Sequence, residues 1–118
     1  MKKKRNINQG DIYMVNLDGI ESEQQNVRPV VVMSANIRNE KSPNIFVFPI
    51  THATKKQQPC HYVLNNDKYE FFIYNKNIVL CEEGRSISKK RLERFLGTID
   101  EYDILEILKI KEYVFIEK

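Results

Sequence analysis

Residues 27–33 (VRPVVVM) constrain the fold more than any other stretch of the chain. The apolar run 30–33 predicts a β-strand that is buried on both faces or nearly so. Pro29 lacks a backbone N–H and is tolerated at the first position of a strand, so the border between loop and strand falls here. A residue before proline is restricted to extended geometry, which holds Arg28 at the mouth of the preceding loop.

Other short apolar runs predict further strands. We expect them at residues 10–17, Asn44–Thr51, 60–64 and 77–81, because of their β-branched and aromatic content. Pro49 favours a bulge or an edge position near the end of its strand. Residues 36–43 are polar and predict a turn-rich connection, whereas the aromatic segment 69–74 either pairs as a strand or covers the core.

The last third of the chain predicts helices. Ser88 is suited to cap a short helix. Residues 95–99 either continue that helix or, because Gly97 favours a break, form a short strand. Asp100 is expected to cap a second helix with an apolar stripe. The stripe consists of Ile104, Leu105, Ile107 and Leu108. The β-like composition of residues 112–116 suggests an additional edge strand.

These elements predict an α+β fold that is mostly β, a small barrel covered by a short helix and a C-terminal helix. We expect a single domain over residues 1–118, with a basic, flexible tail at 1–8, since no linker or repeat interrupts the 118 residues. The net charge of +3 and the clustered basic residues are compatible with an anionic partner.

Composition indicates a cytoplasmic protein that does not enter a membrane. No apolar stretch approaches the roughly 20 residues that a spanning helix needs. The basic start is not followed by the apolar region of a signal peptide. Cys60 and Cys81 form no C-x-x-C pair and suggest reduced thiols.

Arg28 and Thr51 are the candidate functional pair. The guanidinium of Arg28 offers five donors in a fixed fork, which suits a phosphate group. Thr51 is the last residue of the strand expected at Asn44–Thr51, and we expect it to act together with Arg28. Taken singly, Arg28 could equally be a solvated surface residue, and Thr51 a strand-end residue bonded to backbone.

Several motifs occur in an order and at separations that are together quite specific. They are GDIY at 10–13, SEQ at 22–24, VRPVVV at 27–32, PIT at 49–51, Pro59 with His61, and KKRL at 89–92. In these the chain resembles the MazF/PemK-type toxins of bacterial toxin–antitoxin systems over nearly its whole length. The resemblance implies an SH3-like barrel that forms a homodimer and cleaves single-stranded RNA without a metal or other cofactor. It also implies a cognate MazE-like antitoxin whose C-terminal segment lies in the RNA groove.

The resemblance also implies roles for individual residues. Arg28 and Thr51 match the catalytic pair, Arg28 holding the phosphate and Thr51 the phosphate or the 2′-hydroxyl. Residues 22–24 match the loop that lies over bound RNA. The expected RNA-contact set is Ser22, Glu23, Gln24, Lys55, Lys56, Glu82, Glu83 and Arg85.

The segment 81–86 (CEEGRS) departs from the family pattern. Many relatives carry glutamate–glutamine, a hydrophobic residue, arginine and threonine there. Glu83 places an anion where a glutamine is common, which puts base preference and RNA affinity in doubt. Gln25 and Asn26 stand where glycines are common and are expected to stiffen the loop.

Other chemistries find less support. His52 follows Thr51 and is expected to point to the opposite face, so an acid–base histidine pair is not favoured. A zinc site built from Cys60, His61, Cys81 and His52 lacks a recognised ligand spacing. The rival function is a non-catalytic barrel toxin that poisons DNA gyrase, but the chain has no Trp and ends FIEK. A degenerate member that only regulates transcription with its antitoxin also stays open.

Overall fold

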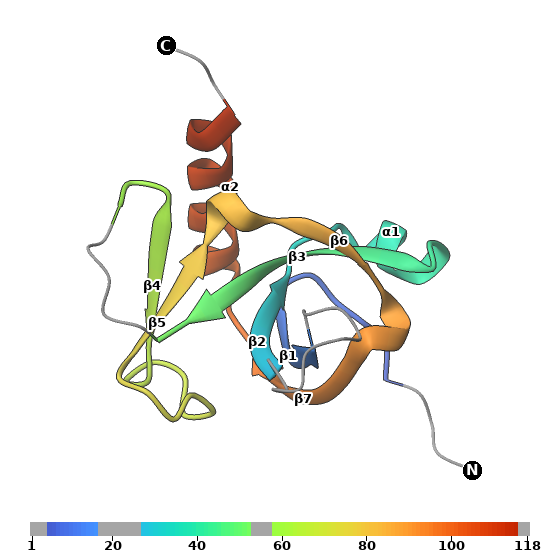
Figure 1. Cartoon of the computed structure of the whole chain (residues 1–118), viewed down its shortest axis with the longest axis horizontal. Coiled ribbons are helices and arrows are strands. Elements are labelled where there is room, and N and C mark those ends of the chain that lie inside the picture. The colour runs from blue at the N-terminus through green and yellow to red at the C-terminus, as the bar shows by residue number, and fades with distance from the viewer. Residues whose placement is uncertain (1–4, 17–26, 53–57, 116–118) are drawn as a thin grey trace.

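Strand β3 (Asn44–Thr51) runs through the middle of the molecule and pairs with three other strands (Figure 1). The computed structural model describes residues 5–16, 27–52 and 58–115. The other strands are β1 (Asp11–Asn16), β2 (Val27–Val32), β4 (His61–Asn65), β5 (Lys76–Leu80), β6 (Arg85–Ser88) and β7 (Leu92–Thr98). The helices are α1 (Asn36–Lys41) and α2 (Glu101–Phe115), with short 3-10 turns η1 (Cys81–Glu83) and η2 (Lys89–Arg91).

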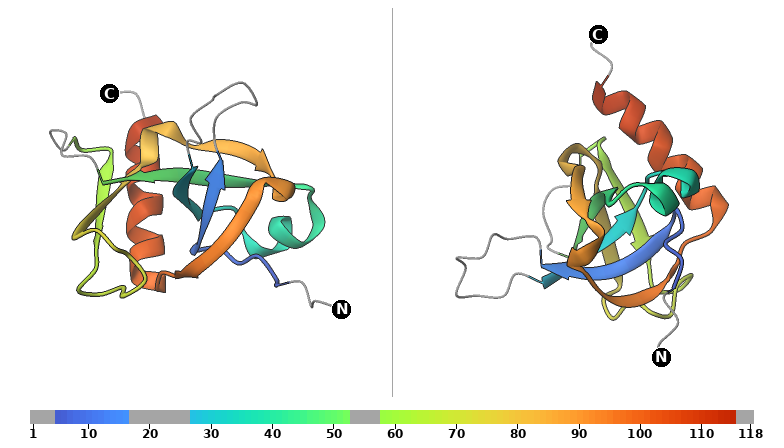
Figure 2. Two further views of the ribbon diagram at one scale, coloured as in Figure 1. Left: turned by 60° about the horizontal axis from the view of Figure 1, so that its bottom comes forward. Right: turned by 90° about the vertical axis from the view of Figure 1, so that its right-hand side faces the viewer.

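The seven strands form one antiparallel sheet in the order β4-β5-β3-β2-β1-β7, and β6 also pairs with β3. Strands β7, β1, β2, β3 and β6 curl around one another, while β4 and β5 extend to one side, beside α2 (Figures 1 and 2). The predicted α+β class is therefore confirmed, with a barrel-like sheet that is curled but not closed.

The outer edge of β3 changes its partner part-way along. Residues 44–47 pair with β6, and residues 50–51 pair with β5. Pro49 lies between these two ladders. Because no strand pairs with it on this edge, the ladders lose no hydrogen bond through its missing N–H. The expectation of an edge-like position at Pro49 is thus confirmed within a strand that is otherwise central.

Two apolar cores lie on the two faces of the curled sheet. The barrel core comprises Tyr13, Val15, Val30, Val32, Ile45, Val47 and Ile87. The helix-side core comprises Ile12, Val31, Met33, Phe48, Ile50, Leu64, Tyr69, Phe72, Val79, Cys81, Ile99 and Ile107. Alternate residues of β2 enter opposite cores, which confirms that its apolar run is buried on both faces.

Helix α2 begins as predicted. The backbone N–H of Asp103 donates to the Asp100 side chain at 3.0 Å, which caps the first turn. Ile107 is fully buried and Ile104 and Leu108 pack against the helix-side core. Leu105 was wrongly assigned to the apolar stripe, because it faces outward and is 50% exposed. Within the described part of the chain, no helix is long and apolar enough to cross a membrane.

Three local predictions were wrong. Residues 36–41 form a helix rather than turns, and residues 112–115 belong to α2 rather than to an edge strand. The cap at Ser88, which accepts from the Lys90 N–H at 3.2 Å, opens only the turn η2. Residues 92–98 then form β7, since pairing with β1 outweighs the helical spacing of their apolar residues.

The segment between β4 and β5 joins the helix-side core through aromatic side chains. Tyr69 and Phe72 are buried, and the ring of Phe71 packs so closely on Gly97 of β7 that a Cβ there would lie 2.3 Å from it. Residues 69–74 thus cover the core, one of the two outcomes that their composition allowed.

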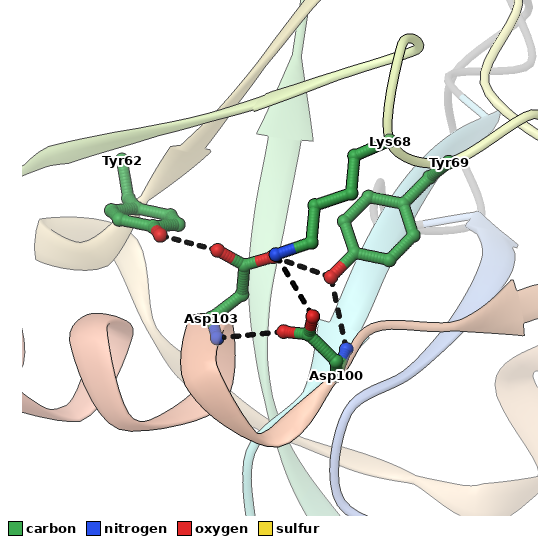
Figure 3. Close-up of polar contacts among 5 residues, drawn as sticks. All are labelled: Tyr62, Lys68, Tyr69, Asp100 and Asp103. Carbon is green, nitrogen blue, oxygen red and sulfur yellow. Dashed lines mark hydrogen bonds and ion pairs between the residues drawn. The ribbon is translucent and has the colours of Figure 1, made fainter.

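A buried carboxylate ties this segment to α2 (Figure 3). Asp103 accepts hydrogen bonds from the hydroxyls of Tyr62 and Tyr69. It also forms an ion pair with Lys68 Nζ at 3.0 Å. Burial, followed by these bonds, raises the pKa of both tyrosines. Lys68 also binds Asp100 at 2.8 Å and, as the largest cause, lowers the pKa of that carboxyl to about 2.

We predict that Asp103→Asn lowers the free energy of unfolding by roughly 2 kcal/mol, because the change removes the charge that two tyrosine hydroxyls and Lys68 share. Urea unfolding checks this, with Glu101→Gln as the matched control at an exposed position of the same turn. Equal losses in the two variants would show that the network contributes little.

Candidate functional site

Arg28 lies at the end of the barrel core. It is the second residue of β2, it is exposed, and it lies opposite Val15 of β1. Side chains alternate along a strand, so Arg28 shares a face with Val30 and Val32. These valines and Val15 are all buried in the barrel core. Arg28 therefore continues an apolar row at the point where that row reaches solvent.

Thr51 is the last residue of β3 and is half-buried. The register between β2 and β3 pairs Val30 with Pro49 as its last pair on this side. Continued by two residues, the same register would bring Thr51 across from Arg28. Residues opposite each other in antiparallel strands have Cβ atoms about 4.5–5.5 Å apart and share a face. On its other edge Thr51 pairs with Ile78 of β5, which fixes the strand end.

Arg85 brings a second guanidinium to this face of the sheet. It opens β6, is exposed, and lies opposite Val47, a barrel-core residue of the strand that ends in Thr51. The turn η1 precedes it and carries Glu82 and Glu83, both exposed. The site thus combines two arginines and a threonine with two carboxylates on the adjoining turn.

The remaining predicted contacts cannot be placed in this arrangement. Ser22, Glu23, Gln24, Lys55 and Lys56 lie outside the described residues. Their roles stay predictions.

Glu82 is held by His61, a contact that spacing alone did not indicate. The imidazole is buried, and its Nε2 lies 3.0 Å from Glu82 Oε2. Its Nδ1 accepts the Gln58 backbone N–H at 3.2 Å, so the neutral ring carries its proton on Nε2 and donates it to Glu82. His61 therefore helps to position the turn η1 through Glu82.

Cys60 completes a cluster with these two side chains. One potential ligand atom from each of Cys60, His61 and Glu82 lies within 4.8 Å of the other two. Sulfur, nitrogen and oxygen donors suit zinc. Both ring nitrogens are already engaged, and burial raises the pKa of the Cys60 thiol, so a metal would have to displace protons and break the bond from Gln58. The neighbouring Cys81 is buried, which raises its pKa to about 12.

Gly84 determines how closely the turn η1 approaches the sheet. A Cβ at this position would lie 2.3 Å from the Phe48 ring and 2.6 Å from the Phe46 ring. The two rings pack edge to face, with centroids 5.6 Å apart, and fill the space that a side chain would need. Gly84 thereby sets the placement of Glu83 and Arg85 on either side of it.

The chain is similar to known proteins in sequence and in fold. Residues 8–112 match the family described as PemK-like, MazF-like toxin of type II toxin–antitoxin system. The endoribonuclease MazF of Staphylococcus epidermidis is 33% identical over 103 residues, covering 86% of this chain and 84% of that protein.

Solved structures show the same fold. MazF of Deinococcus radiodurans superimposes with a TM-score of 0.75 at 18% identity, covering 94% of this chain and 97% of that one. A mycobacterial endoribonuclease solved with its cognate antitoxin gives a TM-score of 0.74 at 17% identity, covering 92% and 93%.

We predict that Gly84→Ala costs about 1–3 kcal/mol of unfolding free energy, because the new Cβ overpacks two phenyl rings. Urea unfolding would measure this, with Ser86→Ala as an exposed control on β6. Adding Phe46→Leu should relieve the clash, so the double variant will be more stable than the two single losses together imply. Strict additivity would contradict the packing argument.

Proposed function

The chain belongs to the PemK-like, MazF-like toxins of type II toxin–antitoxin systems, and we propose that Arg28 and Thr51 form the site with which it cleaves RNA. It is an endoribonuclease toxin that an antitoxin inhibits. The observation that supports the site is the register between β2 and β3, which sets Val30 opposite Pro49, two residues from Arg28 on one strand and from Thr51 on the other.

In the proposed reaction the RNA supplies its own nucleophile. The 2′-oxygen attacks the adjacent phosphorus while the bond from phosphorus to the 5′-oxygen breaks. The products are a 2′,3′-cyclic phosphate and a 5′-hydroxyl end. The site must accept the 2′ proton, stabilise charge on the non-bridging oxygens and return a proton to the leaving oxygen. Side chains and solvent can perform all three tasks, and we propose that no metal takes part.

Arg28 stabilises the developing charge. Its fork of donors can contact two phosphate oxygens at once, and such charge-assisted bonds are strong where water is partly excluded. The apolar row beneath it, formed by Val15, Val30 and Val32, excludes water from one side. Arginine stays protonated in proteins and is therefore a poor general base, so we assign Arg28 to charge stabilisation.

Thr51 and Arg85 complete the phosphate site. The Thr51 hydroxyl either donates to the scissile phosphate or orients the 2′-hydroxyl that attacks it. Arg85, on the same face, attracts a neighbouring phosphate. Electrostatic contacts of this kind make binding depend on salt concentration.

Recognition of bases is assigned to the flanking segments. Ser22, Glu23 and Gln24 lie over the RNA, where carboxylate and amide groups can read unstacked base edges. Lys55 and Lys56 add phosphate contacts, and Glu82 and Glu83 border the site on the turn η1. We further propose that the protein works in the cytoplasm as a homodimer of single domains and binds a MazE-like antitoxin.

We predict that the wild-type protein cuts a long single-stranded RNA in the presence of EDTA. Arg28→Ala and Thr51→Ala should each reduce the rate by at least about 100-fold, the effect of removing a donor to transition-state charge. Mapping the fragment ends tests the reaction, and Arg38→Ala on α1 serves as an exposed arginine control.

The outcomes separate the alternatives. Cutting by wild type and Arg38→Ala alone, leaving cyclic phosphate ends, supports the assignment. Cutting that survives both site substitutions would place the chemistry elsewhere. A folded wild type that cuts nothing would favour a binding toxin or a regulator, and gyrase and antitoxin binding would then be measured.

A separate prediction concerns Glu83. Its exposed carboxylate adjoins Arg85, so it repels RNA phosphates, and Glu83→Gln should tighten binding of a single-stranded RNA by several-fold at low salt. The gain should shrink as salt is added. Fluorescence anisotropy would measure it, with Glu70→Gln as an exposed control. Unchanged affinity would show that Glu83 lies away from the phosphate path.

A further inference from the structure

Two aromatic rings stack beside the end of β3. The imidazole of His52, the residue after Thr51, lies parallel to the ring of Tyr74, with centroids 3.7 Å apart and an interplanar angle of 16°. His52 comes from the end of β3, and Tyr74 comes from the segment that joins β4 to β5. In Figure 1 this segment lies beside the tip of the β3 arrow.

The pair is held in place by buried hydrogen bonds. Asn77 is 3% exposed, and its Nδ2 donates to the Tyr74 carbonyl at 2.9 Å and to the Leu64 carbonyl at 3.1 Å. Asn77 is the residue before Ile78, which pairs with Thr51 at the end of β3. The same residue therefore anchors the backbone of Tyr74 next to the strand that carries His52.

The rings do not belong to either core. His52 is exposed, Tyr74 is 44% exposed, and the neighbouring Ile73 is 84% exposed. A rigidly held, solvent-facing aromatic stack offers a flat apolar surface to a planar partner. Lys76, two residues beyond Tyr74 in the chain, is exposed and adds a positive charge to this segment.

We propose that the His52–Tyr74 stack binds a nucleobase of the RNA substrate, next to the scissile phosphate at Thr51. Unstacked bases of single-stranded RNA bind to aromatic rings, histidine included. Consecutive Cα atoms lie about 3.8 Å apart, and β3 ends at Thr51, so a nucleotide next to a phosphate held by Thr51 can pass around the strand end to reach the stack. Every base has a flat face, so the stack positions the strand rather than selecting a sequence.

The inference rests on the proposed function, and binding of uncleavable RNA tests it separately. The probe is a short RNA that spans the mapped cut and carries a 2′-O-methyl group at the attacked position. An abasic residue then replaces each flanking nucleotide in turn. Wild type is compared with Tyr74→Ala, with Tyr74→Phe, which keeps the ring, and with Tyr102→Ala, an exposed tyrosine control on α2.

At one position next to the cut, loss of the base should weaken binding by wild type, Tyr74→Phe and Tyr102→Ala at least about 5-fold. The same loss should have little effect on Tyr74→Ala. If removal of the base weakens RNA binding equally in wild type and Tyr74→Ala at every position, the proposal is overturned.

If wild type cuts no RNA, the proposed function fails and oligouridine with a single 2-aminopurine replaces the mapped probe. Quenching of its fluorescence by wild type but not by Tyr74→Ala would still support the base-binding stack. Equal quenching by the two proteins, or no binding by wild type, overturns it.

Discussion

The structure depends on β3 having two partners in succession along one edge. Residues 44–47 pair with β6, which returns the sheet on itself, and residues 50–51 pair with β5, which carries the sheet outward. A strand can change partners only where a backbone N–H is missing or otherwise satisfied, and Pro49 meets that condition. The curled part of the sheet and the part formed by β4 and β5 therefore meet at Pro49, two residues before Thr51.

The placement of Thr51 follows from this arrangement. Its strand end is fixed by β5, whose Ile78 pairs with it, so its hydroxyl is presented from a strand rather than from a loop. Such positioning favours catalysis, because donors that are already oriented need no reorganisation when charge develops. The Asp103 network contributes to this positioning, since it fixes β4, the partner strand of β5, and the segment after β4 to α2.

The turn η1 is placed by contacts of a different kind. His61 binds Glu82 from a neighbouring strand, and Gly84 lets the rings of Phe46 and Phe48 come close beneath the backbone. Neither contact has a local signature. A histidine or a glycine reads the same in sequence whether it faces solvent or supports a turn.

How far the sequence predicted the fold can be judged from particular elements. The bounds of Asn44–Thr51 were predicted correctly, and β1, β2, β4 and β5 to within a few residues, because β-branched residues and flanking turn residues are local signals. Strand β6 was missed and β7 was only one of two alternatives. Residues 85–88 carry no apolar run, and the apolar residues of 92–98 have helical spacing, so only their sheet partners decide their conformation.

The sequence by itself determined the buried strand residues 30–32, the extended pose of Arg28 and the helix cap at Asp100. Each depends on residues within a few positions of one another, whose steric and hydrogen-bonding preferences act locally. The predicted border at Pro29 was wrong, because β2 begins at Val27, where pairing with β1 starts. The structure alone decided that His61 holds Glu82 and that His52 stacks on Tyr74. These contacts join segments about 20 residues apart, and strand register, a property of the folded sheet, sets which side chains meet.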